Sequence, residues 1–86
     1  MNITDILTTV SGLLNSSSVT VSSLAAQTQT ASEQLKLGTL TEDEYREIIG
    51  DIQTEQLVKV EASNIAEQQV LASLFSEILS ASEIML

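Results

Sequence analysis

Three consecutive acidic residues, Glu42, Asp43 and Glu44, are the group in this sequence that could act as a metal site or an acid–base pair, with the hydroxyls of Thr41 and Tyr45 on either side. Consecutive residues of a helix point in different directions, so these carboxylates do not converge on one ion. Carboxylates are instead stabilised in the first turn of a helix, where the dipole is positive. We therefore expect no metal site, no cofactor site and no catalytic residue here, and a helix that begins at this point.

The composition removes the commonest catalytic groups from the remainder of the chain. The 86 residues include no His and no Cys, and only one Tyr. General-base catalysis by an imidazole is thereby excluded, and so is ligation of a metal by a thiolate or an imidazole. Thr41 has no base close in sequence to activate it as a nucleophile. We predict that the protein is not an enzyme.

The charge narrows the choice of partners. Three basic residues, Lys36, Arg46 and Lys59, stand against twelve acidic ones, which gives a net charge of −9 and a pI of about 4.1. Binding to nucleic acid requires a basic patch that neutralises phosphates, and three scattered cations do not form one. An anionic membrane surface repels such a chain for the same reason. We expect protein partners and no direct contact with nucleic acid.

Neither a membrane span nor a secretory signal is apparent. The most apolar stretch, residues 70–86, carries two glutamates and is shorter than the ~20 residues that a helical span requires. The first ten residues include Asp5 and no Lys or Arg, unlike the start of a secretory signal. We expect the protein in a virion or in the cytoplasm.

A tight turn at residues 38–41 must position the acidic cluster. Gly38 can adopt the left-handed conformation that ends a helix. Thr41 and Glu44 have the spacing of a capping box, and Leu40 and Tyr45 have the spacing of a hydrophobic staple. These signals predict one helix ending near residue 37 and the next beginning at residue 42.

The apolar spacing predicts an all-α helical hairpin that packs into an oligomer. Apolar residues recur at steps of three and four, which is the helix period. A serine-rich cluster at residues 15–18 predicts a break or kink in the first arm, residues 3–37. No strong stop signal follows, so we expect one long helix over residues 42–80. Residues 1–86 would form a single hairpin domain with an apolar tail at residues 80–86.

Antiparallel packing of the two predicted arms gives a single register along their whole length. It predicts that Ile52, Val58 and Ile65 are buried against Thr28, Val21 and Leu14 of the same chain. The same register pairs Leu35 with Tyr45, Ala31 with Ile48, Val10 with Val70, Leu7 with Leu71 and Ile3 with Phe75. Whether this pairing forms within one chain or between chains stays open at this point.

The C-terminal part of the second arm overhangs the first arm in this register. Its apolar residues cover more than one helix face, as in a helix buried in an assembly. We expect them to form an interface with another subunit or protein. The predicted interface residues are Val70, Leu74, Ile78, Leu79, Ile84, Met85 and Leu86.

One stretch resembles a known family. Residues 35–49, LKLGTLTEDEYREII, are similar to the SHOCT motif, a short two-helix module, with Gly38, Leu40, Thr41, Glu44 and Tyr45 at the matching positions. The resemblance covers about 15 of the 86 residues and implies an oligomerisation or adaptor element without catalytic residues. The long second helix and the few lysines after the turn depart from the pattern. In general style, the chain also resembles small bacteriophage structural and assembly proteins.

These observations predict a non-enzymatic helical component of a larger complex, in the setting of a bacteriophage virion or tail. Two alternatives stay open. The chain could be a small adaptor or co-chaperone that covers an apolar partner helix. It could also be an acidic inhibitor of a host nucleic-acid enzyme, because Glu47, Asp51 and Glu55 form one row at i, i+4 spacing.

Overall fold

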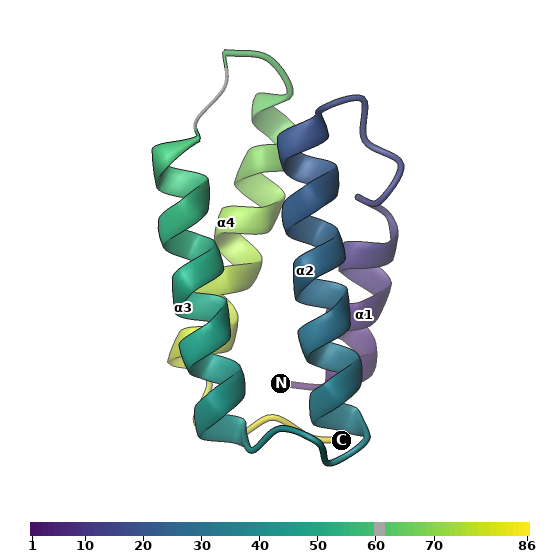
Figure 1. The fold of residues 1–86 in the computed structure, drawn as a ribbon, viewed down its shortest axis with the longest axis vertical. Helices are drawn as coiled ribbons and strands as arrows, with labels where there is room; N and C mark the ends of the chain where they lie inside the picture. The colour runs from purple at the N-terminus through teal and green to yellow at the C-terminus, as the bar shows by residue number, and fades with distance from the viewer. Residues whose placement is uncertain (60–61) are drawn as a thin grey trace.

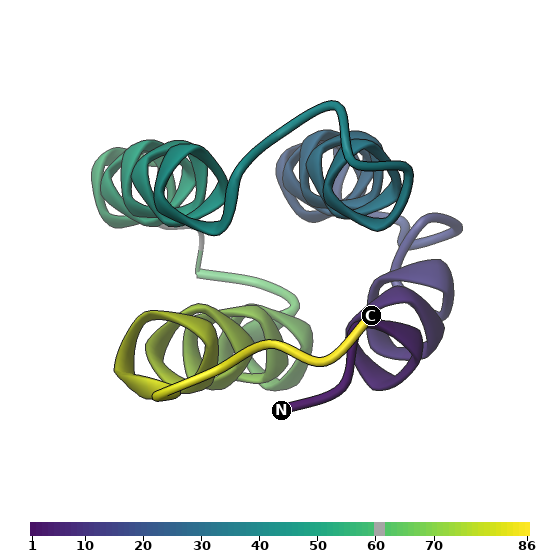
Figure 2. The same cartoon turned by 90° about the horizontal axis from the view of Figure 1, so that it is seen from below.

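Four helices run alternately up and down in the computed structural model, which describes residues 1–59 and 62–86 (Figure 1). They are α1 (Ile3–Ser11), α2 (Val19–Lys36), α3 (Glu42–Val58) and α4 (Ile65–Ser80). The two chain ends lie at the same end of the bundle. Figure 2 shows the helices at four corners, and the all-α prediction is confirmed. The pairs α1–α2, α2–α3 and α3–α4 pack closely and α4 reaches α2 across the diagonal, whereas α1 and α4 make the least contact of the four neighbouring pairs.

Side-chain caps fix three of the helix starts. The Asn2 side chain accepts a hydrogen bond from the amide of Thr4 at 2.8 Å, and the Ser18 hydroxyl accepts one from the amide of Val21 at 3.2 Å. These bonds satisfy donors that a helix start otherwise leaves unpaired. The third start is the predicted capping box at Thr41. Gly38 before it has φ of +81°, the left-handed conformation expected of the turn.

The predicted continuous helix over residues 42–80 is wrong, because this segment forms two helices. α3 ends at Val58 and α4 begins at Ile65. Asn64 before α4 has φ of +57°, a left-handed conformation that Asn tolerates better than most residues and that interrupts a helix. Val60 and Glu61, also inside the predicted helix, lie outside the described residues. Folding α4 back on α3 buries apolar faces that an extended rod would leave in water.

The break predicted at the serine-rich cluster is confirmed, but the first arm folds back instead of continuing with a kink. α1 and α2 pack against each other as antiparallel neighbours. The Ser22 hydroxyl donates to the carbonyl of Leu14 at 2.9 Å, which ties the start of α2 to the loop. The chain is therefore two helical hairpins, α1–α2 and α3–α4, joined at Gly38 through the predicted α2–α3 turn.

The predicted long register fails beyond the middle of α3. Four of the six residues in the predicted pairs are buried or half-buried, namely Ile52, Thr28, Val21 and Leu14. The other two are not, because Val58 is 79% exposed and Ile65 is 57% exposed. The register assumed that both residues belong to one straight helix. Because the chain reverses between them, each lies at a helix end, pointing away from the core.

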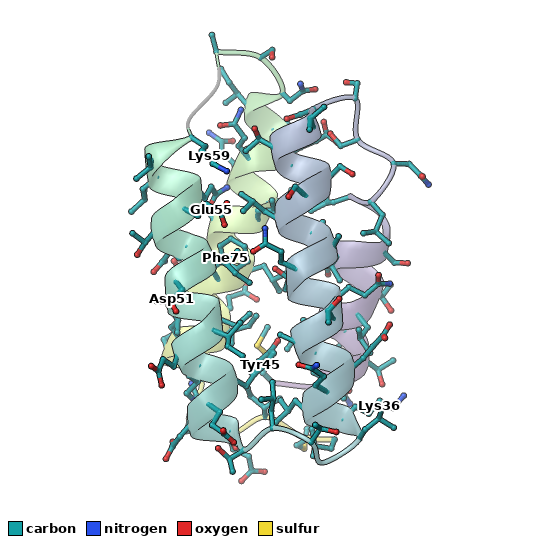
Figure 3. The ribbon with its side chains drawn as sticks, in the orientation of Figure 1. Lys36, Tyr45, Asp51, Glu55, Lys59 and Phe75 are labelled. Carbon is teal, nitrogen blue, oxygen red and sulfur yellow. The ribbon has the colours of Figure 1, made fainter. Side chains whose placement is uncertain are left out.

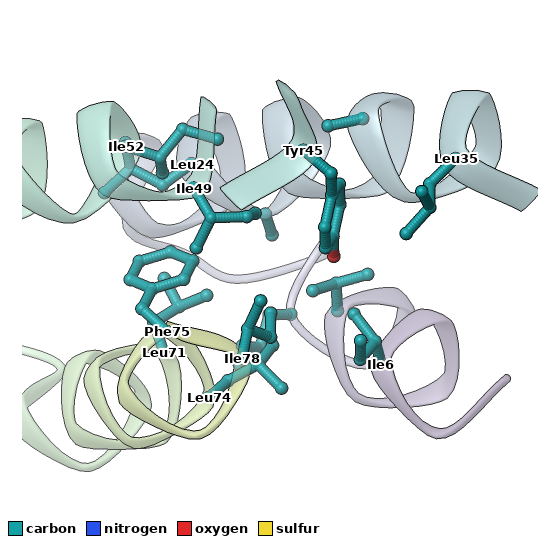
Figure 4. Close-up of a cluster of buried hydrophobic side chains, with 14 of the residues drawn as sticks. Ile6, Leu24, Leu35, Tyr45, Ile49, Ile52, Leu71, Leu74, Phe75 and Ile78 are labelled. Atoms are coloured by element: carbon teal, nitrogen blue, oxygen red, sulfur yellow. The ribbon is translucent and has the colours of Figure 1, made fainter. Parts of the chain in front are cut away.

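The core lies between all four helices and has two rings at its centre. Figure 4 shows Phe75 of α4 close to Ile49, and Tyr45 of α3 reaching toward Ile6 of α1. Both rings are fully buried. The Ser32 hydroxyl donates to the carbonyl of Thr28 at 2.7 Å, so it accepts from the Tyr45 hydroxyl at 2.8 Å. Burial raises the pKa of the Tyr45 phenol, against the smaller, opposite effect of the Ser32 hydrogen bond.

Candidate functional site

The acidic cluster is built as a helix start. The Thr41 hydroxyl accepts from the amide of Glu44 at 3.1 Å, and the Glu44 carboxylate accepts from the amide of Thr41 at 2.9 Å. The bond from the Thr41 amide lowers the pKa of the Glu44 carboxyl, and the nearby Thr41 hydroxyl lowers it further by a smaller amount. Glu42 turns away toward Arg46, 2.6 Å from its guanidinium. Within the described part of the chain, no group of acidic side chains is arranged to hold a metal ion.

Arg46 fastens the end of α4 to α3, a role that the sequence analysis missed. Its guanidinium donates to the carbonyls of Ile78 and Ala81, each at 2.6 Å, and to that of Leu79 at 3.3 Å. Ile78 and Leu79 belong to the last turn of α4 and Ala81 is its C-cap residue, so their carbonyls lie where the backbone lacks helical partners and the dipole favours a cation. The residues involved are more than 30 positions apart, so no local sequence signal could have revealed the contact.

Three of the seven residues of the predicted C-terminal interface belong to the core of their own chain. Leu74, Ile78 and Ile84 are buried inside their own chain. Leu79 is half-buried against the core. The predicted register leaves the tail unpartnered because it treats α3 and α4 as one straight helix. Val70, Met85 and Leu86 keep substantial exposure and are the members of the predicted set that a partner could contact.

The tail is held by the start of the chain instead. The amide of Ile3 donates to the carbonyl of Met85 at 2.8 Å, and the amide of Met85 donates to the carbonyl of Met1 at 2.7 Å. The N-terminal ammonium reaches the carbonyl of Glu83 at 3.1 Å. Figure 2 shows this last segment crossing beneath the bundle from α4 to α1. The crossing places the Ile84 side chain against the core.

Large apolar side chains are exposed at the opposite end of the bundle. We call Val19, Leu57, Val58 and Ile65 the apolar end, because α2 begins, α3 ends and α4 begins there (Figure 1). Val19 is 83% exposed and Leu57 is 72% exposed, and neither is required by the core. Figure 3 shows that Glu55 and Lys59 lie on α3 near this end. Their i, i+4 ion pair at 2.8 Å lowers the pKa of the Glu55 carboxyl.

A groove runs between α1 and α4, which we call the α1–α4 groove. It is a hollow of about 360 Å³ on the side where the two helices make least contact. Helix α1 has 9 residues and α4 has 16, so α1 is too short to cover α4 along its whole length. The lining residues are Thr9, Ala66, Gln69, Val70, Ser73, Leu74 and Glu77. An open groove with a partly apolar floor can receive a protein segment.

Comparisons with known protein families, with curated protein sequences and with solved structures find no match to this chain. The resemblance to the SHOCT motif therefore stays a prediction. No helix in the described ranges is long and apolar enough to cross a membrane.

Proposed function

We propose that this protein is a non-enzymatic helical subunit of a larger protein assembly, and that the apolar end is its contact with a neighbouring subunit. The observation that supports the proposal is the exposure of four large apolar side chains at one end of a bundle that already has a well-filled core. Exposed apolar groups that gather in one region are typical of protein–protein contacts.

The free energies of apolar burial and of association favour reversible binding between copies. Full burial of a Val, Leu or Ile side chain contributes about 1.5–3 kcal/mol. Four such residues give roughly 6–12 kcal/mol before the loss of translational and rotational freedom, which costs about 4–15 kcal/mol. The net charge of −9 adds repulsion between copies. Association of copies through this end is thus weak at low salt and strengthens when salt screens the repulsion.

Sedimentation velocity at several protein concentrations tests the proposal. We expect self-association that increases between low salt and about 1 M salt, because the Debye length falls to about 3 Å while apolar contact persists. Leu57→Lys should abolish it by placing an ammonium group in the contact. Val70→Lys adds the same charge on another face and is the matched control. A protein that stays monomeric at every concentration and salt level contradicts self-assembly through this end.

The bacteriophage setting and the role as an acidic inhibitor stay predictions. The acidic row that motivates the inhibitor lies on α3, where Glu55 already pairs with Lys59. The adaptor alternative is favoured by a separate feature, the α1–α4 groove.

A further inference from the structure

We propose that the α1–α4 groove is a docking site for an amphipathic helix of a second protein, one whose flank carries Lys or Arg. This site is distinct from the apolar end, so the inference goes beyond self-assembly and stands if self-assembly through that end fails.

The shape of the groove suits a helix. Four of its lining residues on α4, namely Ala66, Val70, Ser73 and Glu77, follow each other at steps of four, three and four. This is the spacing by which one helix presents a seam to another. From Ala66 to Glu77 the seam is about 16 Å long, or three helical turns. Helix α1 ends early, so beside the upper part of α4 the loop after α1 takes its place: the Ser16 hydroxyl donates to the Glu67 carboxylate at 3.0 Å, next to Ala66.

The side chains of the seam allow close approach. Ala66 and Ser73 are small, and the distance between packed helices is set by the side chains at their contact. Leu74 forms a buried floor, while Val70 remains 44% exposed beside it. An incoming helix would cover Val70 without displacing any part of the core. Thr9 on α1 supplies the opposite wall.

Charge selects the partner. Glu77 is the ionisable residue of the groove, and its side chain is exposed and takes part in neither of the two ion pairs among the described residues. A second copy of this chain is a poor source of the matching cation, because its net charge is −9 and Lys36 is the one Lys or Arg that the two ion pairs of the described residues leave over. A basic helix is attracted both by Glu77 and by the field of the whole protein.

The test uses two stapled amphipathic peptides that share one Ala/Leu seam, with Lys on the flanks of one and Glu on the flanks of the other. Binding to the full-length protein is followed by fluorescence anisotropy. We expect the Lys peptide to bind at least about tenfold more tightly than the Glu peptide, with an affinity that falls as salt rises. Val70→Lys should weaken binding of the Lys peptide by about tenfold or more. Glu77→Gln should weaken it less and reduce its salt dependence.

Leu57→Lys is the matched control, because it adds the same charge at an exposed position of the apolar end. It should leave peptide binding within about twofold, and circular dichroism should show that both Lys variants remain folded. If Val70→Lys and Leu57→Lys weaken peptide binding equally, the peptide is held by attraction to the overall charge of the protein, and the proposed groove site is overturned. No binding of either peptide also overturns it, as does self-association that Val70→Lys abolishes, which would make a second copy the occupant. Self-assembly has the opposite salt dependence, so its failure is distinguishable from failure of the groove.

Discussion

Replacing Arg46 with Met should destabilise the whole bundle, although Arg46 lies on its surface. The Arg46 side chain is 21% exposed, and its guanidinium makes two short bonds to carbonyls at the C-terminal end of α4, with a third, longer one. Hydrogen bonds to a charged donor contribute about 1.5–3 kcal/mol each. The half-exposed pair with Glu42 adds under about 1 kcal/mol. Because water can reach part of these carbonyls after the substitution, we expect a total loss of about 3 kcal/mol.

A loss of this size is large for so small a protein. Chains of this length have unfolding free energies of roughly 4–13 kcal/mol. The expected shift in melting temperature is about 12–24 °C, at roughly 4–8 °C per kcal/mol. Urea unfolding followed by far-ultraviolet circular dichroism measures it directly. The midpoint should fall while the slope stays unchanged, since the surface exposed on unfolding is nearly the same.

Two further variants separate the contribution of the Arg46 charge from that of its hydrogen bonds to α4. Lys59→Met removes an equal charge from an exposed i, i+4 pair and should cost under about 1 kcal/mol. Arg46→Lys keeps the charge but loses the forked geometry that reaches several carbonyls together, so its loss should fall between the other two. If Arg46→Met and Lys59→Met destabilise the protein equally, the proposed fastening of α4 by Arg46 is refuted.

Three other perturbations test contacts elsewhere in the structure. Burial raises the pKa of the Tyr45 phenol, so its contribution to stability is fully present below the unfolded pKa of about 10 and is lost as the pH rises through the higher folded pKa. Ultraviolet titration of this single Tyr should give a higher pKa in the folded protein than in the urea-unfolded protein, and equal pKa values would contradict the prediction. Thr41→Ala should lower the unfolding free energy by about 1 kcal/mol in urea titrations, whereas no change would mean that the capping box is not formed in solution. Deletion of residues 82–86 should uncover the core beside Ile84 and remove the bonds to Met1 and Ile3, lowering the melting temperature by several degrees; an unchanged melting curve would show that the tail is not docked.

Local signals were sufficient for the elements whose cause is local. Gly38, Thr41 and Glu44 lie within seven residues, and their conformation and hydrogen bonds depend on little outside that stretch. The turn and the start of α3 were therefore predicted correctly, as was the break at the serine-rich cluster. The helix period of the apolar residues was likewise enough to predict an all-α protein.

The tertiary structure decided where the helices fold back and hence which surfaces stay free. An isolated helix over residues 42–80 satisfies the same local propensities as two shorter ones, and Asn64 by itself does not require a reversal. The reversal is favoured by burial of Leu71, Phe75 and Ile78 against helices distant in sequence, together with the bonds from Arg46 to carbonyls 32 to 35 residues away. It turned three predicted interface residues into core and left Val58 and Ile65 exposed. Sequence spacing describes neighbours along one helix, but the balance between a rod and a folded-back pair depends on apolar area buried between segments, which only the packed chain defines.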